Sequence, residues 1–305
     1  MSFLVIGECV ADVVRAPGAA DAVHPGGSPA NVAFGLARLG RATTLLTQLA
    51  DDPYGRILAD HLTGAGVRLV IGGVPERTPS AVVTLDGHGR ASYAFDIGWT
   101  LTAEEPPPAA RPVRHVHLGS IGAAVAPGAG QVLALVRRLR PAATVSYDPN
   151  VRPALMGERA AAVARAEECA ALADVVKASD EDLAWLYPGE PAEAVAARWL
   201  ALGPALVLVT RGADGALAVT REHRAAVAAP AVAVADTVGA GDSFMSAVLD
   251  ALAGTGRAGL AALGADRLAE LLARASAAAA VTVSRAGARP PDRAELDAAL
   301  GGAPA

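Results

Sequence analysis

The chain has 305 residues and a formal net charge of −5, from 26 basic and 31 acidic side chains. Hydrophobic residues make up 52% of it and charged residues 19%, which is typical of a folded chain with a sizeable core. The acidic balance argues against a nucleic-acid partner, and no uncharged stretch has the composition of a membrane span.

A single lysine, Lys177, stands among the basic residues. The residue before it is Val176, so the sequence lacks the Gly-Lys-Ser/Thr of a P-loop. Phosphate binding must therefore rest on backbone amides, with arginine or a metal ion in support. The first residues carry no basic segment and reach Glu8 before an apolar signal core could form, so we expect a cytoplasmic protein.

Strand and helix patterns alternate along most of the chain. Apolar runs predict strands at residues 3–6, 43–46, 113–118, 144–147, 175–177 and 206–210. Helical spacing predicts helices at residues 31–39, 53–62, 130–140, 158–172, 180–186 and 191–202. This succession favours an α/β fold, a doubly wound and mostly parallel sheet with helices on both faces. Ligands of such sheets bind at the carboxyl ends of the strands.

Residues 79–97 interrupt the alternation. Two strand-like runs, 81–85 and 91–95, flank an Asp-Gly turn signal at residues 86–89, which predicts an antiparallel hairpin. Residues 9–14 are also strand-like and lead into a turn-rich stretch. We therefore expect one domain over residues 1–305, with a small β-sheet lid formed discontinuously by about residues 9–25 and 79–97.

The pattern changes again after the last parallel strand. Residues 216–220 and 226–234 predict a hairpin pair, and residues 240–252 and 265–280 predict helices. A β-branched run at residues 281–283 predicts a last strand, followed by a short helix after Pro291.

The most informative motif is residues 236–244, Asp-Thr-Val-Gly-Ala-Gly-Asp-Ser-Phe, directly before an apolar helix pattern. Its glycines allow close approach of a ligand, and free amides at a helix start bind phosphate oxygens. Beside such a turn, Asp242 can take a proton from an attacking hydroxyl. The alternative is a tight turn in which Asp242 only caps the helix. Phe244 excludes a dinucleotide-binding glycine motif, and a hydrolase with a Ser nucleophile is disfavoured because the last histidine is His223.

A second glycine cluster precedes the first long helix. Gly26 and Gly27 permit a close ligand, and Asn31 offers both a donor and an acceptor to hydroxyl groups. Asp12 follows the first strand and can also bind hydroxyls. The alternatives are a plain loop in which Asn31 starts the helix, and a surface position for Asp12.

Two histidines share one face of a predicted strand. His115 and His117 are spaced to point the same way and could hold a metal ion. No third ligand lies nearby in the sequence, so a structural role is favoured.

The glycine pair with Asn31, and residues 236–242, together resemble the two signatures of the ribokinase-like (PfkB) carbohydrate kinases. The resemblance covers essentially the whole chain. Residues 148–155, Asp-Pro-Asn-Val-Arg-Pro-Ala-Leu, resemble a stretch of fructokinases and 2-keto-3-deoxygluconate kinases, except that Met156 replaces a tryptophan. Residues 210–215 resemble the nucleotide loop of the family.

The resemblance implies an ATP-dependent sugar kinase of ribokinase-like fold. It implies that Asp242 is the catalytic base and that the backbone amides of Gly239, Ala240 and Gly241 form an anion hole. It implies that sugar hydroxyls are held, together with Asp242, by Asp12, Gly26, Gly27 and Asn31. It implies that the nucleotide is bound by Arg152, Ser179, Thr210, Gly212, Gly215 and Ser276.

The resemblance also implies metal ions. Mg²⁺ would be organised through water by Asp182, and K⁺, as a monovalent cation, by Asp236. The family's Asn-x-x-Glu motif is Ser179 to Asp182 in this chain. The shorter carboxylate keeps the charge but changes its reach.

For the substrate, the resemblance favours fructose because of residues 148–155 and the Gly-Ser pair at 119–120. A 2-keto-3-deoxygluconate kinase comes next, followed by a ribokinase or nucleoside kinase. A catalytically inert sugar sensor is the alternative from another class. The expected partners are a small sugar, ATP and a second copy of the chain that pairs through the lid sheet edge. Neither nucleic acid nor membrane is expected.

Overall fold

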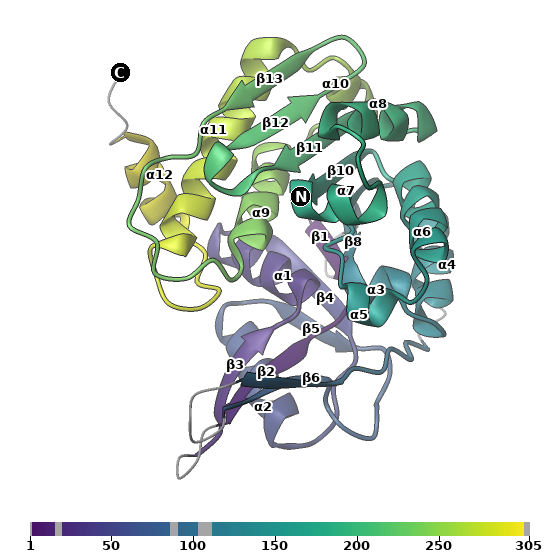
Figure 1. The fold of residues 1–305 in the computed structure, drawn as a ribbon, viewed down its shortest axis with the longest axis vertical. Coiled ribbons are helices and arrows are strands. Elements are labelled where there is room, and N and C mark those ends of the chain that lie inside the picture. Colours follow the sequence, from purple (N-terminus) through teal and green to yellow (C-terminus); the bar gives the residue numbers. More distant parts are fainter. Residues whose placement is uncertain (1, 16–19, 86–90, 103–111, 302–305) are drawn as a thin grey trace.

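Two β-sheets form the framework of the computed structural model, which describes residues 2–15, 20–85, 91–102 and 112–301 (Figure 1). Within those residues the larger sheet has nine strands. From edge to edge they are β13 (Arg224–Val227), β12 (Ala216–Val219), β11 (Leu206–Thr210), β10 (Val175–Ser179), β9 (Thr144–Asp148), β8 (Val113–Gly119), β1 (Ser2–Ile6), β4 (Ala42–Thr47) and β5 (Arg68–Ile71). Neighbours from β11 to β5 pair in parallel, so the mostly parallel sheet is confirmed.

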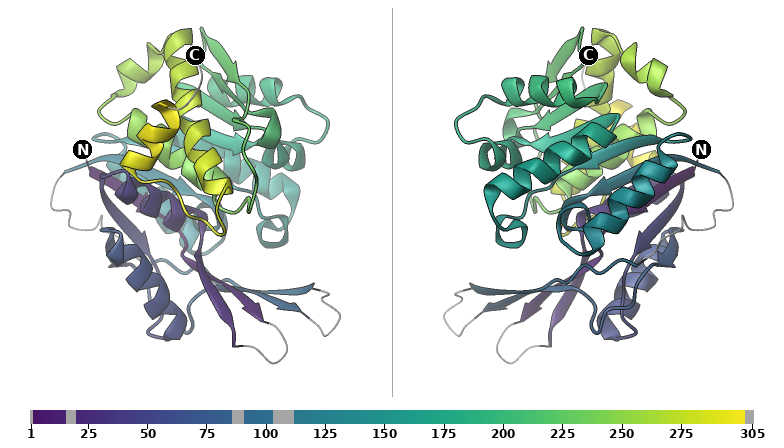
Figure 2. Two further views of the ribbon diagram at one scale, coloured as in Figure 1. Left: turned by 90° about the vertical axis from the view of Figure 1, so that its left-hand side faces the viewer. Right: turned by 90° about the vertical axis from the view of Figure 1, so that its right-hand side faces the viewer.

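Helices cover both faces of this sheet, as Figure 2 shows from two sides. One face carries α3 (Ser120–Ala124), α4 (Gly128–Leu139), α6 (Arg159–Leu172), α7 (Asp180–Leu186) and α8 (Ala192–Leu202). The other carries α1 (Ser28–Arg38), α2 (Pro53–Gly64), α9 (Ala240–Ala251), α10 (Arg257–Ala261), α11 (Ala265–Val283) and α12 (Arg293–Gly301). The doubly wound arrangement is therefore confirmed. None of the helices in the described residues combines the length and apolarity needed to cross a bilayer.

The core is mostly aliphatic and divides along the sheet. In β1, Leu4 and Ile6 pack into the core on the α4 face, whereas Phe3 and Val5 pack against α1 and α2. This division follows from the alternation of side chains along a strand. A strand apolar on both faces is buried on both, which explains why the continuous apolar run at residues 3–6 lies inside the sheet.

The smaller sheet stands apart from the larger one and projects from the body of the molecule (Figure 2). Its order is β3 (Ala22–Gly26), β2 (Val10–Arg15), β6 (Ser80–Leu85) and β7 (Ala91–Asp96). Strands β2 and β6 pair in parallel, and the two outer pairs are antiparallel. A small separate sheet is thus confirmed, although the turn expected at residues 86–89 lies outside the described residues. Its action as a lid, and the assignment of the chain to one domain, stay predictions.

Two strand predictions near the carboxyl end were wrong. Residues 281–283 continue α11, because the Thr282 hydroxyl donates to the Ala278 carbonyl at 3.0 Å and lies 2.8 Å from the Ser243 hydroxyl. Helix packing here outweighs the β-preference of a β-branched run. The strand expected at 226–234 extends only from Arg224 to Val227.

One helix boundary was wrong and several short elements were missed. Helix α1 begins at Ser28 rather than Asn31, because Pro29 is favourable in the first turn of a helix. The pattern gave no sign of strand β5, of helices α3 and α10, or of two short segments, α5 (Pro153–Met156) and η1 (Gly212–Asp214). Segments of three to five residues carry too few apolar repeats for periodicity to detect.

Candidate active site

A cavity of about 1260 Å³ opens at the carboxyl ends of the parallel strands. Glu8 follows β1, Ser120 follows β8 and Asn150 follows β9, and all three line it. Gly212 follows β11 in the same way. The ligand position expected for a doubly wound sheet is therefore where the cavity lies.

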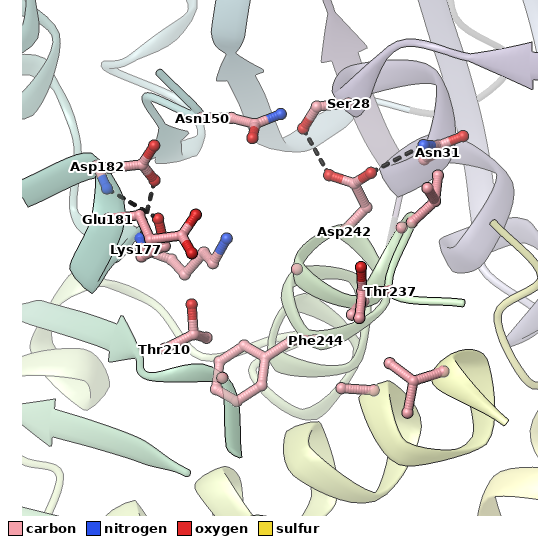
Figure 3. A pocket seen from close by; sticks show the side chains of 18 of the residues that line it. Ser28, Asn31, Asn150, Lys177, Glu181, Asp182, Thr210, Thr237, Asp242 and Phe244 are labelled. Carbon is pink, nitrogen blue, oxygen red and sulfur yellow. Dashed lines mark hydrogen bonds between the residues drawn. The ribbon is translucent and has the colours of Figure 1, made fainter. Parts of the chain in front are cut away.

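Asp242 lies in the first turn of α9 and is held by two side chains from α1 (Figure 3). The hydroxyl of Ser28 donates to its Oδ1 at 2.6 Å, and the Nδ2 amide of Asn31 donates to its Oδ2 at 2.8 Å. Ser28 and Asn31 are three residues apart in α1, so both face α9. Asp242 as a whole is 9% exposed and lines the cavity. This arrangement fixes a carboxylate at the cavity wall.

The turn before α9 brings backbone amides to the same place. Gly239 has φ of 76°, a left-handed conformation, and a Cβ there would lie 2.5 Å from the Cβ of Ala288. The amide of Ala240 donates to the Thr237 carbonyl at 3.3 Å. First-turn amides of a helix have no acceptor four residues earlier within the helix, so this end of α9 attracts anions. Gly239, Ala240 and Gly241 all line the cavity, and the anion hole stays a prediction.

A buried ion pair joins two neighbouring strands below this turn. Nζ of Lys177, in β10, lies 2.9 Å from Oδ2 of Asp148, at the end of β9. The side chains are 5% and 0% exposed. Burial opposes protonation of Lys177, but the charges of Asp148, Asp182 and Asp242 outweigh it and hold its pKa above the ordinary value. The ammonium therefore stays charged at neutral pH.

Glu8 is a buried carboxyl in the cavity wall. It is 1% exposed, and its Oε2 accepts a hydrogen bond from the Gly122 amide at 2.8 Å. Burial raises the pKa of Glu8 to about 7, against the lowering effects of that bond, of Ser120 and of the charge of Arg152. Ser120 has φ of 55°, so the residue beside this carboxyl has a left-handed conformation.

Replacing Glu8 with glutamine should change how stability depends on pH. The folded pKa of about 7 is above the unfolded value of 4.5. The free energy of unfolding of the wild-type protein, relative to that of Glu8→Gln, is therefore highest below pH 4.5. It should then fall, by about 3 kcal/mol in total, as pH rises through 7. Urea unfolding at pH 5 and pH 8 measures this, with the exposed Glu222→Gln variant as the matched control. An unfolding difference that does not change between those pH values would contradict the expectation.

Ser179 and Asp182 cap helix α7 and line the cavity. The Asp182 amide donates to Ser179 Oγ at 3.0 Å, and the Ser179 amide donates to Asp182 Oδ2 at 2.9 Å. The second oxygen of Asp182 accepts from the Val151 amide at 2.7 Å. Asp182 thus joins α7 to the chain after β9, and the shorter carboxylate still completes the cap.

The remaining predicted residues divide into those on the cavity wall and those behind it. The wall includes Asp12, Gly27, Asn31, Arg152, Thr210, Gly212, Gly215 and Ser276. Gly26 lies behind Asp12, where a Cβ would overlap its carboxylate. Asp236 connects two loops outside the wall, because its oxygens accept from the Val238 amide at 3.0 Å and the Gly287 amide at 2.9 Å.

Arg152 lies near the end of the cavity formed by Glu8 and Asp12. Its charge lowers the pKa of both carboxyls, although burial raises the pKa of each. Its guanidinium also donates to the side chain of Asn150 at 2.9 Å. The guanidinium therefore lies near Asp12, one of the residues predicted to bind the sugar, and it also lines the cavity. A contact between Arg152 and phosphate stays a prediction.

Sequence reasoning gave no role to four wall residues, Glu8, Ser28, Asn150 and Lys177. Glu8 and Asn150 had a usable signal, since each closely follows a predicted parallel strand. Ser28 had a weaker signal, because a residue three positions before Asn31 lies on the same face of a helix. Nothing in the sequence pairs Lys177 with Asp148, because the pair depends on the order of strands in the sheet.

His115 and His117 lie in the core. His115 bonds to the hydroxyls of Thr144 and Ser146 at 2.8 Å, and His117 bonds to Ser146 at 2.9 Å. Burial lowers the pKa of both rings to about 3. In the described residues there is no group of three or more His, Cys, Asp or Glu side chains that could hold a metal.

Comparison with known proteins gives consistent results. A family model described as pfkB family carbohydrate kinase matches residues 2–295. A fructokinase of Rhizobium leguminosarum bv. trifolii is 34% identical over 235 residues, which are 76% of this chain and 72% of that protein. A fructokinase structure from Xylella fastidiosa with bound ATP has a TM-score of 0.83 at 30% identity, covering 98% of both chains. A double mutant of Vibrio cholerae fructokinase, with fructose, ADP and a potassium ion bound, has a TM-score of 0.82 at 28% identity, also covering 98% of both.

Proposed function

This chain belongs to the pfkB family of carbohydrate kinases, and we propose that it transfers the γ-phosphoryl group of ATP to a hydroxyl of fructose. The observation that carries the proposal is the carboxylate of Asp242, held by Ser28 and Asn31 at an anion-attracting helix start. Fructose is favoured over other sugars because the relatives compared above are fructokinases, one of them with fructose and ADP bound.

In the proposed reaction Asp242 takes the proton of the accepting hydroxyl. The amides of Gly239, Ala240 and Gly241 stabilise charge on the transferring group. The sugar would lie against Asp12, Gly27 and Asn31, with Gly26 making room for the Asp12 carboxylate. The nucleotide would lie along the part of the wall formed by Thr210, Gly212, Gly215 and Ser276, with Arg152 and Ser179 between the two.

Metal ions accompany this proposal. Asp182 lines the cavity and Glu181 extends into it (Figure 3). One or two carboxylates are the number with which proteins ordinarily hold Mg²⁺ beside nucleotide phosphates, so the donor set fits. Bound there, Mg²⁺ would neutralise charge on the phosphates. For K⁺, Asp236 and the loop at Gly287 are the proposed site, supported by the potassium ion in the Vibrio cholerae structure.

We propose that the small sheet acts as a lid. Ala81 and Phe95, from β6 and β7, line the cavity together with Ile97, and Phe95 is 50% exposed. Closure over a sugar would cover this apolar surface and keep water from competing for the phosphoryl group. The outer strands β3 and β7 leave edges on which a second copy could pair. We also propose that the protein acts in the cytoplasm, where ATP is supplied.

Turnover of ATP with a panel of acceptors tests the function. The wild-type protein is assayed with fructose, 2-keto-3-deoxygluconate, ribose and adenosine, measuring ADP release and the mass of the product. We expect the highest kcat/KM with fructose. A higher value with another acceptor would replace fructose as the substrate. Binding of a sugar without turnover of any acceptor would favour the inert sensor and overturn the kinase proposal.

A further inference from the structure

Lys177 is the one lysine of the chain, and it lies in the cavity wall with no role in the reaction described so far. The residue is 4% exposed. Figure 3 shows its amine directed from β10 toward the start of α9. Among the described residues, Asp148 is the hydrogen-bond acceptor of this ammonium. Because an ammonium has three N–H donors, two remain for a ligand.

The position of the amine relates it to the anion-attracting turn. A Cβ built on Gly241 would lie 2.8 Å from Nζ of Lys177, so the ammonium lies against the backbone next to Asp242. Only glycine leaves this space open. The cation and the first-turn amides of α9 are therefore on the same side of the cavity, where their attractions for an anion add.

The distribution of charge in the wall makes this cation important. Among the described wall residues the acidic side chains are Glu8, Asp12, Asp180, Glu181, Asp182 and Asp242, and the cations are Lys177 and Arg152. Arg152 lies near Glu8 and Asp12. The ammonium of Lys177 lies against the backbone next to Asp242, where a phosphoryl group must arrive. Without it, several carboxylates would face an incoming anion.

A purely structural purpose does not account for the pair. Burying two charges costs several kcal/mol of desolvation, and apolar side chains of similar size commonly stabilise a protein as well or better. Stability is therefore a weak explanation for the ion pair between β9 and β10. A fixed, dehydrated cation that faces a cavity is suited to binding phosphate oxygens.

We propose that Lys177 is a catalytic residue whose ammonium donates a hydrogen bond to an oxygen of the transferring γ-phosphoryl group, and that Asp148 positions it. The inference rests on the proposed function. As the hydroxyl oxygen of the acceptor bonds to the γ-phosphorus, the bond from that phosphorus to the β–γ bridging oxygen of ATP breaks. ADP leaves, and the hydroxyl proton passes to Asp242. Lys177 remains protonated throughout and stabilises the charge on the oxygens in transit.

The test uses Lys177→Met and the double variant Lys177→Met/Asp148→Asn. The single variant leaves Asp148 buried without its partner, so it should melt at a lower temperature. The double variant removes both charges and should recover most of the melting temperature. If Lys177 is catalytic, kcat should stay about 10²–10³-fold below wild type in both variants. Recovery of kcat together with stability in the double variant would show that the lysine serves only the fold.

Nucleotide binding supplies a readout that needs no sugar. Kd is measured for ADP and for the non-hydrolysable ATP analogue AMP-PNP, each with Mg²⁺. The double variant should lose affinity for AMP-PNP by about tenfold or more, with little change for ADP, because the γ-phosphate has lost a charged donor. Equal losses for both nucleotides would overturn the inference. Failure of the proposed function is distinct from this, since it would appear as absent turnover in the wild-type protein.

Discussion

Replacing Asp242 with asparagine is expected to lower kcat with fructose by about 10³-fold, with a much smaller change in KM. Asparagine has the same shape and can still accept the Ser28 hydrogen bond, but it cannot hold the proton of an attacking hydroxyl. The Nδ2 donor of Asn31 faces the second oxygen, so the new amide must turn its own oxygen to one of the two partners. Because the substitution removes the proton acceptor, the decrease in rate should appear in the chemical step.

Steady-state rates and thermal unfolding measure this effect together. Asp266→Asn is the matched control, because Asp266 is an exposed carboxylate in the first turn of α11, outside the cavity. It should leave kcat unchanged. A kcat for Asp242→Asn within tenfold of wild type, at an unchanged melting temperature, would mean that another group takes the proton.

Replacing Asp250 with alanine is expected to lower the free energy of unfolding by about 3 kcal/mol. Asp250 lies near the end of α9, and its side chain is 2% exposed. It pairs with Arg41 and Arg293 at 2.6 Å and with Arg274 at 3.3 Å. Burial opposes its ionisation, but the hydrogen bonds from Arg293 and Arg41 hold its pKa below the ordinary value. Removal of the carboxylate leaves three guanidinium groups close together without the negative charge that they share.

Urea unfolding of Asp250→Ala, with Asp297→Ala as the matched control, tests this expectation. Asp297 also pairs with Arg274, at 3.6 Å, but is 56% exposed, so its removal should cost less than about 1 kcal/mol. Folded Asp250→Ala should retain its kcat, because Asp242 lies two turns away along α9. Equal unfolding free energies for the two variants would show that the three arginines do not depend on Asp250.

The sequence by itself determined the fold class and the place of the site. Continuous apolar runs such as residues 3–6 identified strands buried on both faces, and their alternation with helix patterns identified a parallel sheet. Residues 236–242 identified the helix start that forms one wall of the cavity. These signals are local, because side-chain periodicity and glycine-rich turns act over a few neighbouring residues. At residues 281–283 the local pattern predicted a strand and was wrong, because packing decided the conformation.

Only the tertiary structure decided which side chains meet. Ser28 reaches Asp242 across 214 positions, and Lys177 reaches Asp148 because β9 and β10 are neighbours in the sheet. Asp250 pairs with arginines from the residue before β4, from α11 and from α12. The physical reason is that hydrogen bonds and ion pairs act over a few ångströms, whatever the distance along the chain. The sequence thus determined most of the longer elements and the glycine-rich turn before α9, and the order of strands and the packing of α1 on α9 decided which side chains surround that turn.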